Sequence, residues 1–387
     1  MQYDLVLRNG RVLDPGAAGG NTRDDADVAF TAGKVAAIGP GLRGRSERDV
    51  SGCLVMPGHI DFHAHVYWGG TSISIDADAL ARRSGTTTWL DAGSAGPGNF
   101  AGFRAHVIEP SQTRILAALH VSHAGIYAFS KTAMVGESLD MRLMDTETCA
   151  AVARAHPDLI RMVKVRVGMN TSGVNGIAPL YHALAAADRA GLPVMCHIDR
   201  PPPRLADVLA DLRPGDILTH CFKPFPNAPC TADGRVLDAC WQARERGVLF
   251  DIAHGAGSFD FGVAEAMLAG GFPPDIISSD VHVLCIDGPA WDTMETMSKF
   301  LYLGMELPDI VRAVTAAPAL AMRRPDLADL SIGSTGDATV MRLQEGRFTL
   351  TDSVGNTRTG RQRFALDSMV VGGALWHAAD AAAMAAD

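Results

Sequence analysis

The 387-residue sequence predicts an α/β fold, in which a (β/α)8 barrel, also called a TIM barrel, carries a small β-sandwich-like domain formed by both termini. Two observations lead to this fold class. In the middle of the chain, short apolar runs alternate with helix-like stretches, which is typical of βα units around a parallel sheet. Both ends of the chain show hairpin patterns instead. We therefore expect a composite β domain from residues 1–58 and 325–387, and a barrel from residues 59–324.

The N-terminal segment is expected to form β-hairpins. Apolar residues flank Asn9-Gly10, a dipeptide that favours the type I′ turn of a two-residue hairpin. A second hairpin is expected around Ala32-Gly33, and residues 53–56 follow as a short strand. Near the C-terminus, Glu345-Gly346 is the expected turn of a third hairpin. We expect the two terminal segments to pair with one another.

Eight apolar runs are expected to be the strands of the barrel. They lie at residues 60–65, 87–91, 115–121, 160–167, 192–198, 217–222, 248–253 and 276–281. Their number and spacing match a (β/α)8 barrel, which needs about 250 residues. An open, doubly wound sheet is the alternative arrangement of such units.

The composition is that of an ordinary soluble protein. The chain has 34 Lys and Arg against 43 Asp and Glu, a net charge of -9, and this excess of acidic groups argues against a nucleic-acid partner. No signal peptide is evident and no apolar stretch reaches the roughly 20 residues that cross a bilayer, so we expect a cytoplasmic protein without a membrane partner.

The seven cysteines form no C-x-x-C pair and are expected in the core. The alanine-rich C-terminal tail is expected to be a helix or a frayed end, and a homo-oligomer is compatible with the sequence.

Ionisable residues recur at the carboxyl ends of the expected strands, which is where a barrel places its active site. The first strand ends in His63-Ala64-His65, and two histidines at this spacing point to the same side of a strand. The whole set comprises His63, His65, Lys164, His197, His220 and Asp280. Each alone has an ordinary explanation, as a core histidine, a lysine that reaches solvent from a strand end, or an aspartate that caps a helix.

The order of these residues along the chain favours a shared function. They belong to the first, fourth, fifth, sixth and eighth expected strands, and their spacings correspond to whole numbers of βα units of roughly 30 residues. All of them therefore face the same mouth of the barrel. Imidazole and carboxylate groups gathered in this way predict a metal site.

This order, together with the phrase V-M-P-G-H-I-D-F-H-A-H at residues 55–65, resembles the amidohydrolase superfamily over nearly the whole chain. The resemblance is to the binuclear metal-dependent subtype, which includes dihydroorotases, hydantoinases and D-aminoacylase-like deacetylases. A β domain built from both termini belongs to the same pattern.

The resemblance implies a binuclear metal centre. In such proteins CO2 carboxylates the strand-four lysine, so Lys164 is expected to become a carbamate that offers one oxygen to each of two divalent ions. His63, His65 and Asp280 are then expected to hold one ion, and His197 and His220 the other. Zinc is the expected metal, while manganese, iron or cobalt also suit these ligands. A hydroxide between the two ions is the expected nucleophile, with Asp280 as the catalytic base and acid.

Departures from the family pattern narrow the activity. Dihydroorotases follow the two histidines with an arginine, whereas residues 66–68 are V-Y-W here. Mononuclear deaminases have a glutamate three residues after the strand-five histidine, where this chain has Arg200. The stretches at residues 164–166, 174–177 and 197–203 resemble the deacetylase branch instead.

We therefore expect a metal-dependent hydrolase that removes an acyl group from an N-acyl or O-acyl derivative of a small α-substituted carboxylic acid. A cyclic amidase of the hydantoinase or dihydroorotase type is the alternative, and a non-catalytic binding protein on the same scaffold has no need of a complete ligand set. An anionic substrate needs a cation at the mouth, and Arg166, two residues after Lys164, lies on the same strand face. Arg200 and His254 are further expected substrate contacts, with Lys223 in a neighbouring loop.

Overall fold

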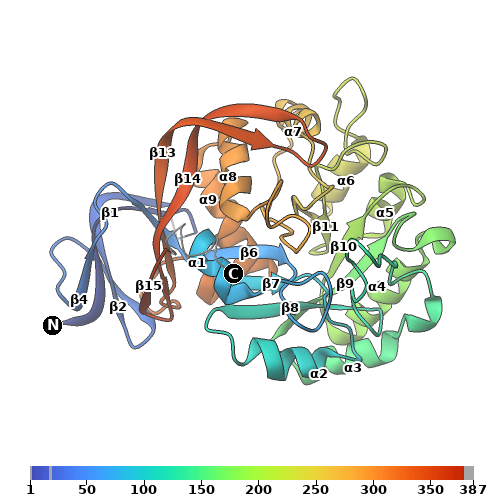
Figure 1. The fold of residues 1–387 in the computed structure, drawn as a ribbon, viewed down its shortest axis with the longest axis horizontal. Coiled ribbons are helices and arrows are strands. Elements are labelled where there is room, and N and C mark those ends of the chain that lie inside the picture. Colours follow the sequence, from blue (N-terminus) through green and yellow to red (C-terminus); the bar gives the residue numbers. More distant parts are fainter. Residues whose placement is uncertain (1, 17–19, 379–387) are drawn as a thin grey trace.

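The computed structural model describes residues 2–16 and 20–378. Two β-sheets organise this part of the chain (Figure 1). One is an eight-stranded sheet that combines strands from both ends of the sequence, and the other is a seven-stranded sheet from its middle. The alanine-rich tail at residues 379–387, predicted as a helix or a frayed end, lies outside the described residues.

The eight-stranded sheet joins the two ends of the chain. It consists of β1 (Tyr3–Asp14), β2 (Asn21–Thr31), β3 (Lys34–Gly39), β4 (Gly44–Asp49), β5 (Leu54–Pro57), β13 (Ala338–Thr351), β14 (Thr357–Val371) and β15 (Ala374–His377). Its order is β15-β14-β13-β5-β1-β2-β3, with β4 beside β1. The two ends meet where β5 runs antiparallel to β13, with the buried Val55 opposite the buried Val340. Strands from both ends of the chain therefore pair as predicted, and they form one continuous hydrogen-bonded sheet.

Two of the three predicted hairpin turns are wrong. Asn9-Gly10 lies inside β1, where the register shifts and Asn9 has a φ of 60°, so this dipeptide forms a bulge instead of a turn. Glu345-Gly346 likewise lies inside β13, at a shift in its pairing with β14. Neither strand ends there, because each continues to pair with its neighbours beyond the irregular position. The predicted turn at Ala32-Gly33 is confirmed, since it joins β2 to β3 with a positive φ at both residues.

The hairpin of β13 and β14 connects the small sheet to the barrel. Figure 1 shows both strands passing over α8 (Thr293–Tyr302) toward α7 (Phe261–Ala269). The backbone N–H of Phe364 in β14 donates to Ser298 Oγ of α8 at 3.0 Å. In the turn between the strands, the N–H of Ser353 donates to the carbonyl of Phe259 at 3.0 Å. The tip of this hairpin is thus fixed against a barrel loop.

The seven-stranded sheet is parallel throughout and curls on itself. Its strands are β6 (His59–Ala64), β7 (Thr86–Asp91), β8 (Arg114–His120), β9 (Ile160–Val167), β10 (Val194–Ile198), β11 (Ile217–Thr219) and β12 (Leu249–Asp251), paired in sequence order. Nearly all of their residues are buried, because a parallel sheet is covered on both faces. Seven of the eight predicted strands are thereby confirmed in place, and the sixth and seventh are shorter than predicted.

The predicted eighth strand, residues 276–281, is irregular. It makes one parallel bridge to each edge of the sheet, from Ile276 to Asp251 of β12 and from Val281 to Ala64 of β6. Asp280 has a φ of 49°, which lies outside the range of extended strands. The described chain thus has seven regular barrel strands, and the eight that the sequence predicts are not all formed.

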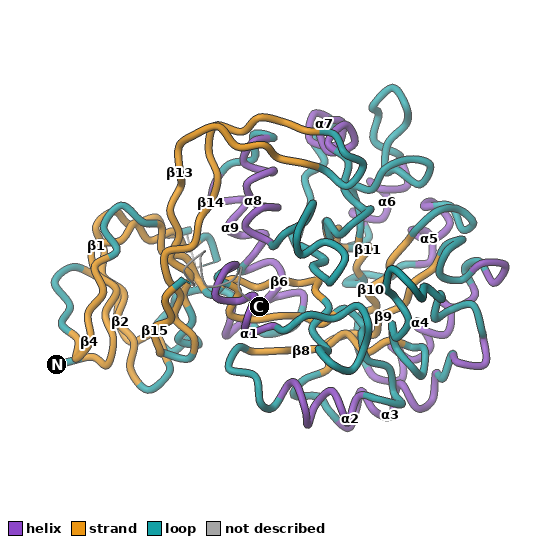
Figure 2. The backbone as a smooth tube through the Cα atoms, in the orientation of Figure 1, coloured by secondary structure: helices purple, strands orange, loops and turns teal. Residues whose placement is uncertain are grey.

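Helices cover the outside of the parallel sheet. Beside α7 and α8 they are α1 (Ala77–Ser84), α2 (Phe100–Phe103), α3 (Thr146–Ala155), α4 (Ala178–Ala190), α5 (Leu205–Asp211), α6 (Asp238–Glu245), α9 (Leu307–Val314) and α10 (Ala316–Ala321), with short helical turns at Arg104–Ile108, Met141–Leu143, Gly173–Asn175 and Pro325–Leu327. Figure 2 shows α2 to α6 following the outer side of the curled sheet. Local sequence explains where α1 begins and ends, since Asp76 caps its first turn and Gly85 ends it with a φ of 70°.

The cysteines lie in the core of the protein. All seven cysteines are buried and free, as predicted for core residues. No helix in the described part of the chain combines the length and the apolar character that a membrane crossing requires.

Candidate active site

The site lies above an apolar layer inside the curled sheet. Met162, Met195 and Ile217 belong to a buried cluster in this interior. Two residues further along β9 and β10, on the same faces, stand Lys164 and His197. The apolar layer therefore closes the sheet below these polar side chains, which face the loops at the carboxyl ends of the strands.

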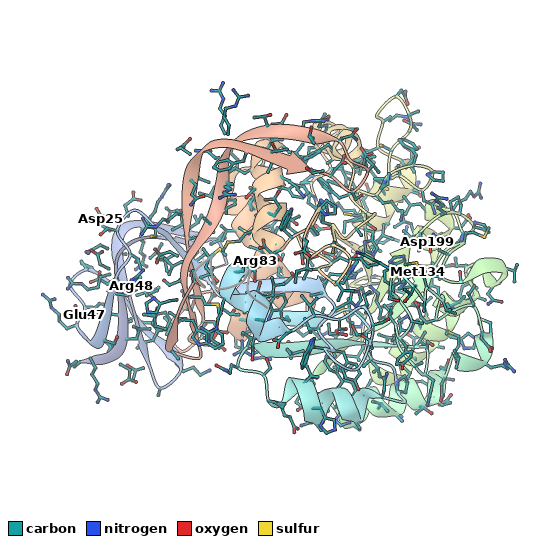
Figure 3. All side chains as sticks on the ribbon, in the orientation of Figure 1. Asp25, Glu47, Arg48, Arg83, Met134 and Asp199 are labelled. Atoms are coloured by element: carbon teal, nitrogen blue, oxygen red, sulfur yellow. The ribbon has the colours of Figure 1, made fainter. Side chains whose placement is uncertain are left out.

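All six candidate ligands line a single cavity of about 450 Å³. The lining includes His63, His65, Lys164, His197, His220 and Asp280, together with Arg166 and Arg200. Figure 3 labels two further residues of the wall, Met134 and Asp199, at this end of the barrel. Residues from the ends of β6, β9, β10 and β11 and from the irregular segment at residues 276–281 are thus brought to one place.

Three of these residues approach one another closely. His63 Nε2 lies 3.5 Å and His65 Nε2 lies 3.3 Å from Asp280 Oδ1. One potential ligand atom from each of the three lies within 4.8 Å of the other two. Lys164 Nζ is 3.3 Å from His63 Nε2, so the lysine adjoins the same group.

His197 and His220 stand beside this group. Their ring centroids are 4.3 Å apart, and the ring of His220 is 5.1 Å from that of His63. The Nε2 atoms of His197 and His220 are buried, and no described residue is within hydrogen-bonding reach of them. A buried polar atom without a partner costs about 1–3 kcal/mol, so a ligand that occupies both nitrogens would stabilise the protein.

Hydrogen bonds at Nδ1 orient the rings. The Thr219 hydroxyl donates to Asp251 Oδ2 at 2.9 Å and therefore accepts from His63 Nδ1 at 2.8 Å. His220 Nδ1 donates to a backbone carbonyl at 2.8 Å, and His65 Nδ1 lies 2.9 Å from a serine hydroxyl. In His63 and His220, protonation at Nδ1 leaves the lone pair of Nε2 free and directed into the cavity, which is how proteins prepare histidines to bind metals.

Burial sets the protonation states of the site. It lowers the pKa of His65 to about 3 and those of the other three histidines well below 6.5, so all four rings are neutral at pH 7. Burial also lowers the pKa of Lys164 to about 8 and raises the pKa of Asp280 to about 6. Neutral imidazoles beside a carboxylate form a donor set that fits a divalent cation such as zinc.

The backbone is strained at two of the ligand positions. His220 has a φ of 65° and Asp280 a φ of 49°, and Ala253, whose carbonyl binds His220, has a φ of 42°. Residues with a side chain rarely adopt this left-handed conformation, which costs about 1–3 kcal/mol each. Such strain is concentrated at functional sites, and here it directs the side chains of both ligands into the cavity.

Comparisons with known proteins agree with this geometry. No protein-family model matches the chain. A deacetylase of Agrobacterium fabrum is 34% identical over 376 residues, which cover 96% of this chain and 91% of the relative. A deacetylase of Enterococcus faecalis is 30% identical over 382 residues, which cover 97% of this chain and 100% of the relative. The chain belongs to the amidohydrolase superfamily.

Two solved structures support this membership. One described as an adenine deaminase has a TM-score of 0.90 and 30% identity, with 97% of this chain and 100% of that chain covered. One described as a dihydroorotase has a TM-score of 0.86 and 32% identity, with 98% of both chains covered. The amidohydrolase fold therefore extends over the β domain as well as the barrel.

The cavity of this amidohydrolase also carries cations in its wall. Arg166 and Lys223 line it and are buried, whereas Arg200 lines it and is exposed. Lys223 Nζ donates to a backbone carbonyl at 2.7 Å, and burial lowers its pKa to about 8. Asp199, an acidic residue of the same wall, already accepts a hydrogen bond from the Thr171 hydroxyl at 3.0 Å. Cationic groups in a partly enclosed wall favour an anionic ligand.

His254 is placed away from the cavity. It is absent from the described residues that line the cavity, its ring stacks on Phe259 at 4.8 Å, and its Nε2 accepts from Lys299 Nζ at 2.9 Å. The next residue, Gly255, packs so tightly against Asp280 that a Cβ there would collide with the carboxylate. This placement gives no support to the predicted substrate contact by His254 and makes it part of the loop beside Asp280.

Sequence reasoning missed several residues of the cavity wall. His282 is buried in the wall, and its Nδ1 accepts from a backbone N–H at 3.2 Å, so its proton lies on Nε2. The spacing of His282 from Asp280 is the same as that of His63 from His65, and this pattern could have revealed it. Ser353 and Val354 reach the wall from the turn between β13 and β14, and nothing in the local sequence indicates that.

Proposed function

We propose that the chain is a metal-dependent deacylase, which hydrolyses an N-acyl or O-acyl derivative of a small α-substituted carboxylic acid. One observation carries the proposal: four neutral histidines, a lysine and an aspartate converge on a cavity whose wall also holds three cationic side chains. The relatives named deacetylase, at 30 to 34% identity, support acyl hydrolysis as the reaction class.

The donor atoms suit two divalent metal ions, with zinc the proposed metal. His63, His65 and Asp280 form the group for one ion. His197 and His220 offer their unpartnered Nε2 atoms to the other. Divalent ions held by these residues would polarise a carbonyl oxygen and lower the pKa of a water molecule.

Lys164 is proposed to act as a carbamate. An ammonium 3.3 Å from His63 Nε2 would repel a cation bound to that nitrogen. Because burial lowers its pKa to about 8, the neutral amine is a larger fraction of Lys164 at pH 7 than of a solvated lysine. The nitrogen then forms a bond to the carbon of CO2. The electrons of one C=O π bond move onto its oxygen, and the nitrogen releases a proton. The resulting carbamate has two oxygens and a negative charge, so that an anionic metal ligand stands where the ammonium was a cation.

Asp280 is proposed to transfer the proton during hydrolysis. Its Oδ1 lies within 3.5 Å of two histidine Nε2 atoms, next to the space for the scissile bond. Burial raises its pKa to about 6, which suits a carboxylate that accepts a proton from the attacking water and returns it to the leaving nitrogen or oxygen.

The carboxylate of the substrate is proposed to bind the cations of the wall. Arg166 is the first candidate, because its guanidinium is buried at the cavity and can form two parallel hydrogen bonds with a carboxylate. Lys223 and Arg200, which follow the strand ends of His220 and His197, supply further positive charge.

A cyclic amidase of the hydantoinase or dihydroorotase type is the second candidate. The observation in its favour is the solved structure described as a dihydroorotase, which is 32% identical to this chain. The V-Y-W sequence at residues 66–68 argues against it, since an arginine is expected there in dihydroorotases.

An assay of zinc-loaded protein separates the two candidates. Acid release is measured with paired D and L N-acetyl amino acids, O-acetyl 2-hydroxy acids, hydantoins and dihydroorotate. Turnover of an acyl series in one enantiomer is expected, whereas turnover of the cyclic amides alone would establish the second candidate. Asp280→Asn is expected to lower kcat by about 10²- to 10⁴-fold, and the exposed Asp233→Asn is the matched control. Full turnover by a metal-loaded Asp280→Asn variant would rule out the proton-transfer role.

A further inference from the structure

A buried carboxylate that the proposed reaction does not use stands behind the cavity wall. Glu137 lies in the long segment between β8 and α3, residues 121–145, and is buried there. The same segment brings Phe129 and Met134 to the cavity. Because a carboxylate is costly to bury, Glu137 needs a partner that compensates for the loss of water.

Two groups meet on one oxygen of Glu137. Its Oε1 lies 3.2 Å from Arg166 Nε and 3.2 Å from His120 Nε2. His120 Nδ1 accepts a hydrogen bond from the backbone N–H of Ser122 at 2.9 Å. The proton of the neutral imidazole is therefore on Nε2 and is donated to Glu137. The carboxylate thus ties the guanidinium of Arg166 to a ring whose own orientation is fixed.

The backbone on both sides of Glu137 is also fixed. An added Cβ at Gly136 would lie 2.6 Å from the carbonyl oxygens of Asn170 and Thr171, so the chain packs directly against this backbone. The N–H of Ser138 donates to the Thr171 carbonyl at 3.1 Å. Residues 170 and 171 follow β9, the strand that carries Arg166. Glu137 and the guanidinium it contacts are therefore held to the same strand end.

Glu137 contacts the guanidinium of Arg166 on its Nε side. Nε of Arg166 is buried and forms an ion pair with Glu137 Oε1 at 3.2 Å without a hydrogen bond, and the ring of Phe129 lies 4.9 Å from the guanidinium carbon. Nε itself has no hydrogen-bond partner among the described residues, and the side chain of Arg166 lines the cavity. The two Nη atoms form the edge that binds a carboxylate through two parallel hydrogen bonds.

We propose that Glu137 is a positioning residue, which presents the Nη edge of Arg166 to the carboxylate of the substrate. This inference rests on the proposed function, because it supplies the reason why an acid is recognised. Glu137 is the one described carboxylate that pairs with Arg166, so without it the buried guanidinium would turn toward another acidic group or toward water.

Kinetics with a substrate pair tests this role. The acid that the protein hydrolyses best is compared with its carboxamide, which has the same shape without the charge. We expect Glu137→Ala to raise KM for the acid by about tenfold or more, with a smaller effect on kcat and none on KM for the carboxamide. Glu137→Gln keeps an oxygen beside Arg166 Nε and an acceptor for His120 Nε2, and is expected to recover most of the loss. Glu147→Gln, in an exposed pair with Arg189, is the control and should match the wild type.

A second measurement does not depend on turnover. In protein labelled with ¹⁵N-arginine, the Nε–H resonance of Arg166 is assigned by its loss in Arg166→Lys. We expect this proton to exchange slowly with water in the wild type and rapidly in Glu137→Ala. Unchanged exchange in Glu137→Ala would overturn the positioning role, as would an equal rise in KM for the acid and the carboxamide. If the wild type hydrolyses none of the N-acyl or O-acyl derivatives, the proposed function is refuted instead. The exchange measurement then still decides the role of Glu137.

Discussion

Replacing Lys164 by Met separates the contribution of this residue to catalysis from its effect on stability. The side chain is fully buried in β9, with Nζ 3.3 Å from His63 Nε2 and 3.5 Å from Met195 Sδ. In metal-free protein kept free of CO2, the amine carries a proton at pH 7, because even its lowered pKa of about 8 lies above that pH. Methionine has a similar length and no charge, so the substitution removes the buried charge with little change in packing.

The size of the stability effect follows from the pKa. A fall from 10.5 to about 8 corresponds to about 3 kcal/mol, since one pKa unit is worth about 1.4 kcal/mol. This is the cost of burying the ammonium at pH 7. Loss of the hydrogen bond to His63 offsets about 1 kcal/mol of the gain from removing it. We therefore expect Lys164→Met to raise the free energy of unfolding of metal-free protein by about 2 kcal/mol at pH 7.

The same reasoning gives the sign of the pH dependence. Because the pKa of Lys164 is lowered in the folded state, the folded protein loses this proton at a lower pH than the unfolded chain does. The wild type therefore gains stability relative to Lys164→Met as the pH rises from about 8 to 10.5.

Two assays check the prediction. Urea unfolding of metal-stripped proteins, followed by tryptophan fluorescence, measures stability, and acid release by zinc-loaded proteins in bicarbonate measures catalysis. We expect turnover to fall by roughly a thousandfold or more while stability rises. The exposed Lys131→Met is the control for both assays. A variant less stable than the wild type by more than about 1 kcal/mol would show that Lys164 is a structural ion-pair partner, and wild-type turnover would refute the carbamate.

Two further predictions concern the loops around the cavity. Burial alone would raise the pKa of Glu137, but the charge of Arg166 and the hydrogen bond from His120 lower it from 4.5 to about 2. The folded protein should therefore lose stability as the pH falls from 4.5 to about 2, and Glu137→Gln should lessen this loss by on the order of 3 kcal/mol in urea titrations at stepped pH. Asp352 accepts from the backbone N–H of Phe261 at 3.0 Å and so fixes the turn between β13 and β14. We expect Asp352→Ala to lower stability by about 1–3 kcal/mol and to raise KM more than it lowers kcat, as measured by urea unfolding and steady-state kinetics.

Each of these predictions has an outcome that contradicts it. If the glutamine variant at position 137 lost stability in acid as steeply as the wild type, the carboxylate would not be the group that titrates. If proteolysis of the turn at residues 352–356 became faster in Asp352→Ala while KM stayed the same, the hairpin tip would have no part in substrate binding.

Much of the barrel was predictable because its signals are local. An apolar run of five to eight residues followed by a polar one marks a buried parallel strand and its carboxyl end, whatever its neighbours are. The placement of Lys164 and His197 at the cavity follows from this alternation and from the parallel direction of β9 and β10. The predictions went wrong where the same local signal has two outcomes. A residue with positive φ before a glycine makes either a turn or a bulge, and at Asn9-Gly10 the pairing of β1 with strands on both sides selected the bulge.

Other features depend on contacts between distant segments. His254 follows its strand as the ligands do, yet Lys299 of α8 engages its ring away from the cavity. The irregular segment at residues 276–281 is shaped by hydrogen bonds to two different strands, which its own apolar pattern does not contain. Glu137 is an ordinary acidic residue of a long loop in the sequence, and only the approach of Arg166 and His120 gives it a role.

By itself the sequence determined the family, the curled parallel sheet and the set of candidate ligands. These follow from residue type and from periods of two to about thirty residues, which a linear chain displays directly. Only the tertiary structure decided which nitrogen of each histidine faces the cavity, which cation is tied to a buried carboxylate, and that a hairpin of the distant β domain forms part of the cavity wall. The physical reason is that hydrogen bonds and ion pairs depend on distances of about 3 Å between atoms, and the folded backbone sets those distances between residues that lie far apart in the chain.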